Sequence, residues 1–337
     1  MSFTLPKFKL NEFESSLNKS SNEKIFDDLR QISREVGTFY LVGHGVDESL
    51  IKELFQISQQ FFALPLEKKE EISMINSPQF RGYSSEGGEY TDGGKDYREQ
   101  IDWGTDKPAL RWDLNSALYK RLEGPNPYPK ALPHFKELFL EYQRQTHKAA
   151  MTLLRAFSKA LELEDDAFDK LYGENTYEHY KFIRYPAAFD GHTQGVGSHK
   201  DGGLITFVLQ HEQSGLQGFI NGKWQDVAPL KNSFVVNIGE FLEMATNGYL
   251  KATIHRVNLS PKERFSIAYF LGTQLDKDIP IFKLKENYAK EALGVDTDPK
   301  NPLLRNVAQN YFKRMLRSHP DVAKTHHSDL IERFKFA

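Results

Sequence analysis

The stretch HKDGGLITFVLQ (residues 199–210) decides the fold, because two potential metal ligands stand directly before an apolar run of strand-forming residues. Short apolar or alternating runs, separated by Gly, Asn and Asp, continue around it from about Tyr177 to Gly272. These runs cover residues 204–210, 216–220, 224–227, 233–238 and 264–271. Asn221-Gly222 separates two of them and is a strong hairpin signal. Regularly spaced short strands of this kind predict a sandwich or jelly roll.

Helical patterns flank this central region on both sides. Apolar side chains recur at helical spacing over residues 25–36, 50–61, about 133–163 and 304–315. Ser20 and Glu23 fit a capping box before the first helix, and residues 39–42 read as a short strand between the first two helices. We therefore expect an α+β fold, with a jelly-roll core flanked by N-terminal, middle and C-terminal helices.

Composition limits the function classes. The chain has 337 residues and no cysteine, with 44 Lys and Arg against 46 Asp and Glu, so the formal net charge is −2. This balance lacks the basic excess of proteins that bind nucleic acid or acidic membranes. Without cysteine, metal chemistry falls to imidazole and carboxylate ligands. Neither a signal peptide nor an apolar run of about 18 residues is visible. We expect one compact cytoplasmic unit over residues 1–337, monomeric, with no nucleic-acid or membrane partner.

His199, Asp201 and His255 form the first candidate site. Residues i and i+2 of a strand point to the same side, so the side chains of His199 and Asp201 can converge, and His255 could complete a triangle. Two imidazoles and one carboxylate leave three positions of a metal open, which is the facial triad of non-haem Fe(II) oxygenases.

Arg264 and Ser266 form the second candidate site, since they share one face of a strand shortly after His255. A guanidinium fork beside a hydroxyl suits a carboxylate, which it can hold by charge-assisted hydrogen bonds. A small diacid could thus be chelated by a metal at one end and held by this pair at the other.

These motifs resemble those of the iron and 2-oxoglutarate-dependent oxygenase superfamily, in its isopenicillin N synthase-like branch. The resemblance rests on HKDGGLITFVLQ, on SFVVNIGEFLEMATNG (233–248) and on KATIHRVNLSPKERFSIAYFLG (251–272). EVGTFYLVGHGV (35–46) and KDYREQIDWG (95–104) resemble the earlier part of those enzymes. The resemblance implies an N-terminal helical and β region over 5–115 and a double-stranded β-helix over 176–275.

The resemblance also implies roles for individual residues. His199, Asp201 and His255 would bind Fe(II), and Arg264 and Ser266 would bind the distal carboxylate of 2-oxoglutarate. Tyr185 matches a tyrosine that assists there, and Phe270 would wall the co-substrate pocket. The implied activity consumes O2 and 2-oxoglutarate, releases succinate and CO2, and hydroxylates, desaturates or cyclises a small-molecule substrate.

The Gly-rich segment 86–94 is expected to form a mobile lid over the iron, and it locally resembles the bacterial ethylene-forming enzyme, which consumes arginine. Glu89, Thr91 and Arg317 match residues that contact the amino acid in that enzyme, whereas Gly202 stands where it has an aromatic residue. Glu89 could equally tether the lid.

Lys181 and His179 lie near these motifs in the sequence without belonging to them. We expect Lys181 to be exposed, although it could help to hold an anion. We expect His179 on the surface or in a loop.

Other function classes fit part of the pattern. An Fe(II) oxidase like isopenicillin N synthase would use no 2-oxoglutarate. A non-catalytic jelly roll could keep the pocket for sensing a ligand. A zinc hydrolase could use the same three ligands, but it would give Arg264 and Ser266 no evident purpose.

Overall fold

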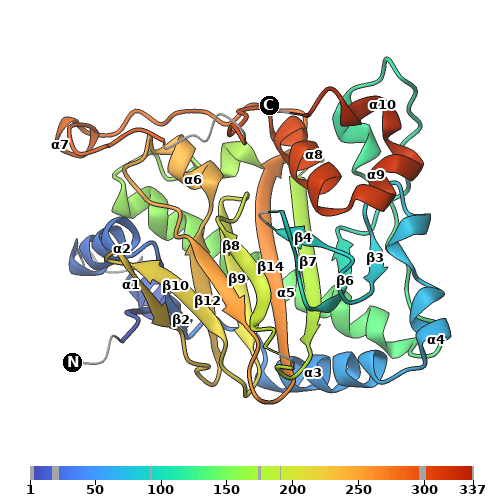
Figure 1. The fold of residues 1–337 in the computed structure, drawn as a ribbon. Coiled ribbons are helices and arrows are strands. Elements are labelled where there is room, and N and C mark those ends of the chain that lie inside the picture. The colour runs from blue at the N-terminus through green and yellow to red at the C-terminus, as the bar shows by residue number, and fades with distance from the viewer. Residues whose placement is uncertain are drawn as a thin grey trace.

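The predicted strands pair into two facing sheets in the computed structural model, which describes residues 4–16, 23–91, 93–173, 176–189, 191–295 and 301–335 (Figure 1). The larger sheet contains, in spatial order, β1 (Lys7–Lys9), β2 (Thr38–Val42), β12 (Ser233–Ile238), β9 (Ile205–Gln210), β14 (Arg264–Gln274), β7 (Thr176–Tyr185), β6 (Glu99–Gly104) and β3 (Gly82–Ser84). The smaller sheet contains β11 (Lys223–Asp226), β10 (Leu216–Ile220), β13 (His255–Asn258) and β8 (Gln194–His199). A separate hairpin joins β4 (Tyr90–Thr91) to β5 (Gly94–Lys95).

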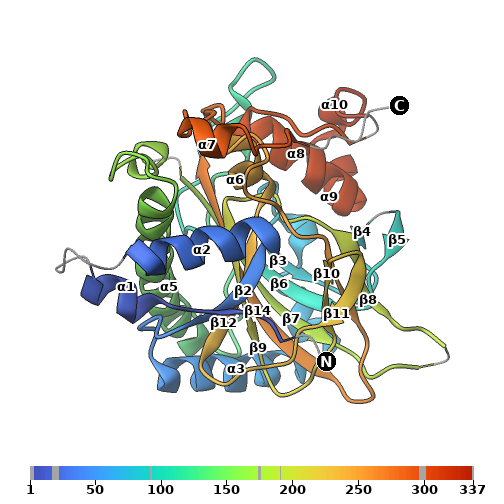
Figure 2. The same cartoon turned by 90° about the vertical axis from the view of Figure 1, so that its left-hand side faces the viewer.

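Helices from the N-terminal, middle and C-terminal parts of the chain pack around the two sheets, and some of them cover the outer face of the larger sheet (Figure 2). The α-helices are α1 (Leu10–Ser16), α2 (Glu23–Glu35), α3 (Glu48–Phe62), α4 (Leu66–Glu70), α5 (His134–Ala160), α6 (Glu240–Ala245), α7 (Glu286–Ala289), α8 (Val307–Ser318), α9 (Pro320–His326) and α10 (Ser328–Ile331). Short 3-10 turns are η1 (Met74–Asn76), η2 (Leu118–Arg121) and η3 (Asp169–Leu171).

Two apolar cores follow from this layering. One lies between the larger sheet and helices α2, α3 and α5, and it includes most of the buried aromatic side chains. The other lies between the two sheets and contains Ile183, Tyr185, Val196 and Val257. β2, β7, β9 and β12 have side chains in or against both cores, because successive residues of a strand point to opposite faces of the sheet.

The α+β jelly-roll class predicted from the sequence is confirmed. The hairpin prediction is also correct: Asn221 and Gly222 have φ of 52° and 75°, and Ile220 pairs with Lys223, as a two-residue turn between strands demands. Ser20 of the predicted capping box lies outside the described residues.

The helix predicted over residues 304–315 starts later than expected. Leu304 was expected on its apolar face, but α8 begins at Val307. The reason is local, because the Asn306 side chain accepts a hydrogen bond from the backbone N–H of Gln309 and so caps the helix at that point.

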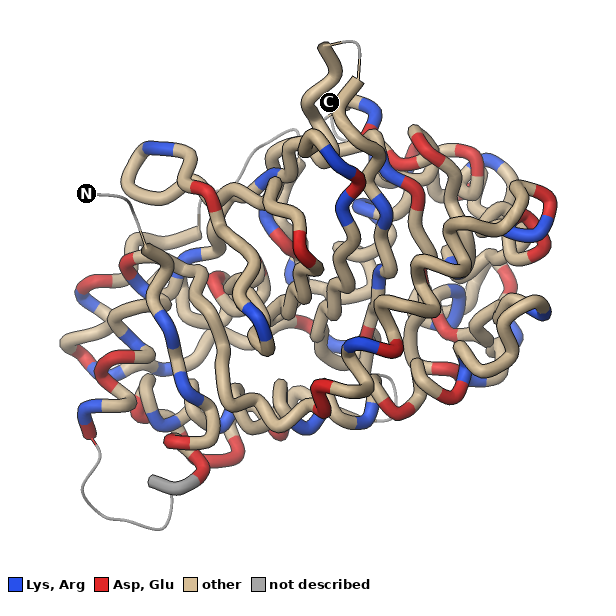
Figure 3. The backbone as a smooth tube through the Cα atoms, turned by 90° about the horizontal axis from the view of Figure 1, so that it is seen from below, with Lys and Arg blue, Asp and Glu red and all other residues tan. Residues whose placement is uncertain are grey.

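The N-terminal region is built into the same sheet as the central region. β2 pairs with β12, and β6 pairs with β7, so strands from both halves of the chain share one hydrogen-bonded layer. Basic and acidic residues are interspersed along the chain, as Figure 3 shows from below. None of the helices in the described part of the chain combines the length and the apolar character needed to cross a membrane.

Trp103 on β6 is the centre of the outer core, since its ring lies 4.8 Å from that of Phe135 and 4.9 Å from that of Phe139, and it is fully buried. We predict that Trp103→Ala lowers the free energy of unfolding by about 3–5 kcal/mol, because it leaves a large cavity. Urea unfolding followed by far-UV circular dichroism measures this. Leu114→Ala, at a side chain that is 75% exposed, is the control and should change stability by less than about 0.5 kcal/mol. Equal effects of the two substitutions would contradict this account.

Candidate active site

His199 and His255 face each other across the smaller sheet. His199 is the last residue of β8 and His255 the first of β13, and the two are directly paired in the antiparallel register. The register shifts immediately beyond His255, so an irregularity of the bulge type sits beside the pair. Asp201 was expected on the same strand as His199, but β8 ends at His199 and the chain leaves the sheet there. This departure still brings the Asp201 carboxylate within 3.6 Å of His199 Nε2 and 3.5 Å of His255 Nε2.

The second nitrogen of each imidazole fixes how the rings can act. His199 Nδ1 lies 2.9 Å from the Gly197 carbonyl oxygen, and His255 Nδ1 lies 3.0 Å from that of Thr253. A carbonyl only accepts, so both Nδ1 atoms carry a proton, and both Nε2 atoms face Asp201. Burial lowers the pKa of His199 to about 3, with the neighbouring His255 adding to the effect, so the ring stays neutral.

The carboxylate of Asp201 is held from a third side. Asn237 on β12 donates to Asp201 Oδ2 at 3.3 Å, and Thr38 fixes the amide by donating to Asn237 Oδ1 at 2.9 Å. Burial raises the pKa of Asp201, but the two imidazoles outweigh it and leave this pKa below its usual value. One ligand atom from each of His199, Asp201 and His255 lies within 4.8 Å of the others, and in the described part of the chain no other cluster of such residues does so. Two imidazoles and one carboxylate are a donor set that fits Fe(II).

Arg264 is the centre of the second candidate site. Its side chain is 1% exposed, and it donates to Ser266 Oγ at 3.2 Å and to Gln210 Oε1 at 3.0 Å. The guanidinium lies 4.9 Å from the ring centroid of Tyr185, which is its partner across β14 and β7. Among the described residues, its Nε has no hydrogen-bond partner and no acid pairs with Arg264. Burial lowers the pKa of Arg264, and this buried cation without a carboxylate fits the distal end of a diacid.

A cavity of about 530 Å³ opens beside the cluster of His199, Asp201 and His255. Its walls include His199, Asp201 and Phe270, and Phe270 shares a strand face with Arg264 and Ser266. Arg264 and Ser266 themselves are not among the residues that line this cavity. The residues matched to amino-acid contacts, Glu89, Thr91 and Arg317, all line it.

The positions of Lys181 and His179 correct the sequence expectations. Both were expected at the surface, but Lys181 is 8% and His179 6% exposed on the inner face of β7. Lys181 Nζ lies 2.9 Å from Glu89 and 3.0 Å from Asp102, and His179 Nε2 lies 2.7 Å from Asp102. Two carboxylates face Lys181, and this pairing makes burial of the ammonium possible.

The Glu89 carboxylate already has several protein partners, more than a residue kept free to bind substrate would have. Arg98 and Gln100 donate to its Oε2 at 2.7 and 2.6 Å, and Lys181 reaches both oxygens. Burial raises the pKa of Glu89, but Arg98 and Lys181 outweigh it, so the pKa lies well below its usual value. These contacts fit the tethering role of Glu89.

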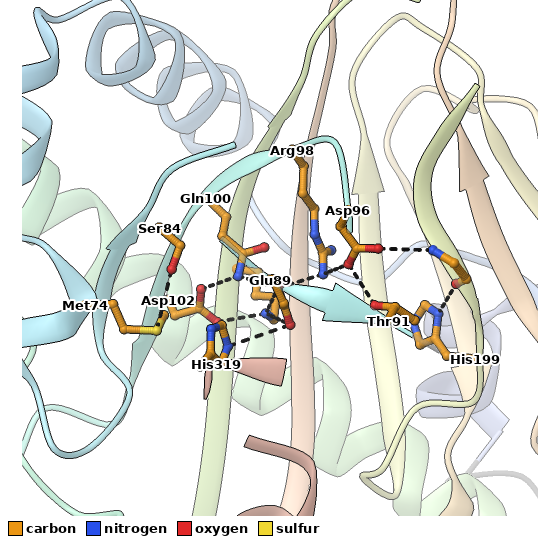
Figure 4. A network of polar contacts seen from close by, with 12 residues as sticks. Met74, Ser84, Glu89, Thr91, Asp96, Arg98, Gln100, Asp102, His199 and His319 are labelled. Atoms are coloured by element: carbon orange, nitrogen blue, oxygen red, sulfur yellow. Dashed lines mark hydrogen bonds and ion pairs between the residues drawn. The ribbon is translucent and has the colours of Figure 1, made fainter. Parts of the chain in front are cut away.

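Asp96, which the sequence did not single out, connects the β4–β5 hairpin to β8, the strand that carries His199. Its Oδ2 accepts hydrogen bonds from Thr91 Oγ1 at 2.7 Å and from Arg98 at 3.1 Å, and its Oδ1 accepts one from the backbone N–H of Gly197 at 3.2 Å. The carbonyl of the same Gly197 accepts from His199 (Figure 4). Asp96, Asn237 and Gln210 carry no sequence signal, because ordinary polar residues gain such roles only by position in the fold.

Comparison with known proteins gives consistent matches. The family described as the 2OG-Fe(II) oxygenase superfamily matches residues 175–273, and the N-terminal family of the non-haem dioxygenase in morphine synthesis matches residues 5–131. The 2-oxoglutarate-dependent dioxygenase frbJ of Dothideomycetidae sp. (strain 11243) is 35% identical, covering 91% of this chain and 88% of that protein. Homoarginine-6-hydroxylase 2-ODD-C23.1 of Arabidopsis thaliana is 33% identical, covering 79% of this chain and 82% of that protein. The crystal structure of a full-length Neurospora crassa protein in complex with alpha-KG matches the fold with a TM-score of 0.71, at 24% identity over 86% of this chain and 93% of that chain.

We predict that stability falls as the pH is lowered from about 6.5 toward 4, in part through His179. Burial lowers the pKa of His179 from 6.5 to about 4. The unfolded chain therefore binds the proton first, with a slope of up to about 1.4 kcal/mol per pH unit. His179→Gln, whose amide can still donate to Asp102, should flatten this part of the profile in urea unfolding at fixed pH. His134→Gln, at a ring that is 60% exposed, should keep the wild-type slope. Identical slopes in all three proteins would show that His179 does not contribute.

Proposed function

Because the chain belongs to the 2OG-Fe(II) oxygenase superfamily, we propose that His199, Asp201 and His255 are the ligands of its Fe(II). The enzyme is an Fe(II)- and 2-oxoglutarate-dependent dioxygenase that oxidises a small-molecule substrate. The single observation that supports the ligand assignment is the clustering of both Nε2 atoms with the Asp201 carboxylate. The oxidase, the sensing and the zinc hydrolase alternatives have no such support, since the relatives are named 2-oxoglutarate-dependent dioxygenases.

We further propose that Arg264, Ser266 and Tyr185 hold the distal carboxylate of 2-oxoglutarate, with Phe270 between that carboxylate and the cavity. The buried guanidinium, which no acid among the described residues neutralises, supports this assignment. When bound, Fe(II) and 2-oxoglutarate supply the oxidation of a substrate C–H bond by O2, with release of succinate and CO2. The protein's own part is to orient both imidazoles through the Gly197 and Thr253 carbonyls, to orient Asp201 through Asn237 and to keep water from the Arg264 end.

Glu89, Thr91 and Arg317 are the proposed substrate-side residues. They line the cavity, although Glu89 also accepts a hydrogen bond from Lys181 and Thr91 donates one to Asp96. The relatives named homoarginine-6-hydroxylases make L-homoarginine the first compound to test.

We also propose that the chain works as a single unit in the isopenicillin N synthase-like branch, with the N-terminal region over 5–115 and the β-helix over 176–275. The matched ranges 5–131 and 175–273 support these boundaries.

We predict that Asp201→Ala and His199→Ala abolish Fe(II) binding and turnover, because each removes one of the proposed ligands. The measurement is an anaerobic titration of apo-protein with Fe(II) and then 2-oxoglutarate, followed by the visible charge-transfer absorption of the chelated 2-oxo acid. Asp165→Ala, at an acid that is 75% exposed, should keep the band. A full band and full activity in Asp201→Ala would overturn the ligand assignment.

We predict that Arg264→Met weakens 2-oxoglutarate binding by about 2–4 kcal/mol, the scale for loss of buried charge-assisted hydrogen bonds. The same anaerobic titration gives the dissociation constant. Arg155→Met removes an arginine that is 57% exposed on α5 and should leave this constant unchanged. An unchanged affinity in Arg264→Met would place the co-substrate elsewhere.

A further inference from the structure

Two glycines beside the metal ligands make room for two side chains of α8. A Cβ atom at position 202, directly after Asp201, would overlap the guanidinium of Arg314. A Cβ at position 272, on β14, would lie only 2.6 Å from the hydroxyl of Tyr311. Tyr311 and Arg314 are three residues apart on one helix, so they share a face. Figure 1 shows α8 across the ends of β7 and β14, and both side chains line the cavity.

The Tyr311 hydroxyl is a buried hydrogen-bond donor with no acceptor among the described residues. Tyr311 is 7% exposed, and its hydroxyl has no hydrogen-bond partner among the described residues. Buried hydroxyls in folded proteins are nearly always hydrogen-bonded. Tyr311 belongs to the apolar core and also lines the cavity, so a ligand in the cavity can supply the missing acceptor.

The Arg314 guanidinium has donor capacity left after its contacts with the protein. It reaches Glu240 Oε2 and the Lys200 carbonyl oxygen, both at 3.3 Å, which is long for hydrogen bonds of a guanidinium. These contacts account for two of its five N–H groups. The side chain is 25% exposed, so its remaining donors can reach a molecule in the cavity.

We propose that Tyr311 and Arg314 form a subsite for a carboxylate group of the primary substrate. A carboxylate can accept two parallel hydrogen bonds from a guanidinium and a further one from a hydroxyl. Both groups also lie within electrostatic range of Asp201, so the bound carboxylate places the rest of the substrate beside the metal ligands. The subsite is distinct from Arg264, which does not line the cavity. It deepens the proposed function and rests on the assignment of Asp201 as a metal ligand.

The test uses the full-length enzyme loaded with Fe(II) and 2-oxoglutarate. The probes are matched pairs: L-homoarginine, L-arginine and 3-phenylpropionate, each with its methyl ester. Substrate-dependent succinate release is measured for the wild type, Arg314→Met, Arg314→Lys, Tyr311→Phe and Gly202→Ala. We expect at least one acid to stimulate release about tenfold more than its ester. Arg314→Met should raise the KM for that acid about tenfold or more, Arg314→Lys should restore part of the loss, and Tyr311→Phe should have a smaller effect.

Gly202→Ala is the second route to the same result, because the new methyl group must push the flexible end of Arg314 away. Arg155→Met is the control and should behave as the wild type. Equal stimulation by acid and ester, no stimulation by any acid, or an unchanged KM in Arg314→Met would overturn the proposal. It would also fail if Arg314→Met raised the KM for 2-oxoglutarate instead, since the arginine would then serve the co-substrate. If the wild type showed no charge-transfer band on anaerobic titration with Fe(II) and 2-oxoglutarate, that result would instead refute the proposed function.

Discussion

The hydrogen bonds from two imidazole Nδ1 atoms to backbone carbonyls are the interactions on which the site depends. They assign the proton to one side of each ring and leave the other side for a metal. The carbonyls belong to residues two positions before each histidine, Gly197 on β8 and Thr253 just before β13, so the local backbone sets the ring orientations. Because side chains alternate along a strand, a slip of one residue between β8 and β13 would turn one imidazole away. The register of this sheet is therefore a chemical constraint as well as a structural one.

The inner face of β7 changes character along its length. Tyr185 and Ile183 belong to the apolar core between the sheets, whereas Lys181 and His179 lie among charged groups beside the cavity. The apolar end surrounds Arg264 and lowers the local dielectric, which strengthens its attraction for a carboxylate. The charged end gives the substrate cavity polar walls. One strand thus separates the proposed co-substrate site from the substrate space.

Burial of the charges near the cavity is made possible by pairing across elements. Lys181 on β7 meets Glu89 beside β4 and Asp102 on β6, and each acid without a partner would be costly to bury. Asp96 extends the same network to Gly197 and so to His199. The hairpin over the cavity is consequently bonded to the strand that carries a proposed metal ligand. A substrate that moves this hairpin would act on the backbone that orients His199.

The sequence by itself determined the jelly-roll class, the flanking helices and the hairpin at Asn221-Gly222, because hydrophobic period and turn chemistry are local properties. It also indicated His199, Asp201 and His255 together, because they stand in motifs that resemble those of a known superfamily. Only the tertiary structure showed that Asp201 lies beyond the end of β8. Only the tertiary structure decided that Lys181 and His179 are buried, because their countercharge Asp102 comes from a strand almost eighty residues earlier. The roles of Asn237 and Arg314 were also invisible in the sequence. An amide or a guanidinium has no pattern of its own, and its function arises only when folding brings distant backbone segments, and a glycine that leaves space, to the same point.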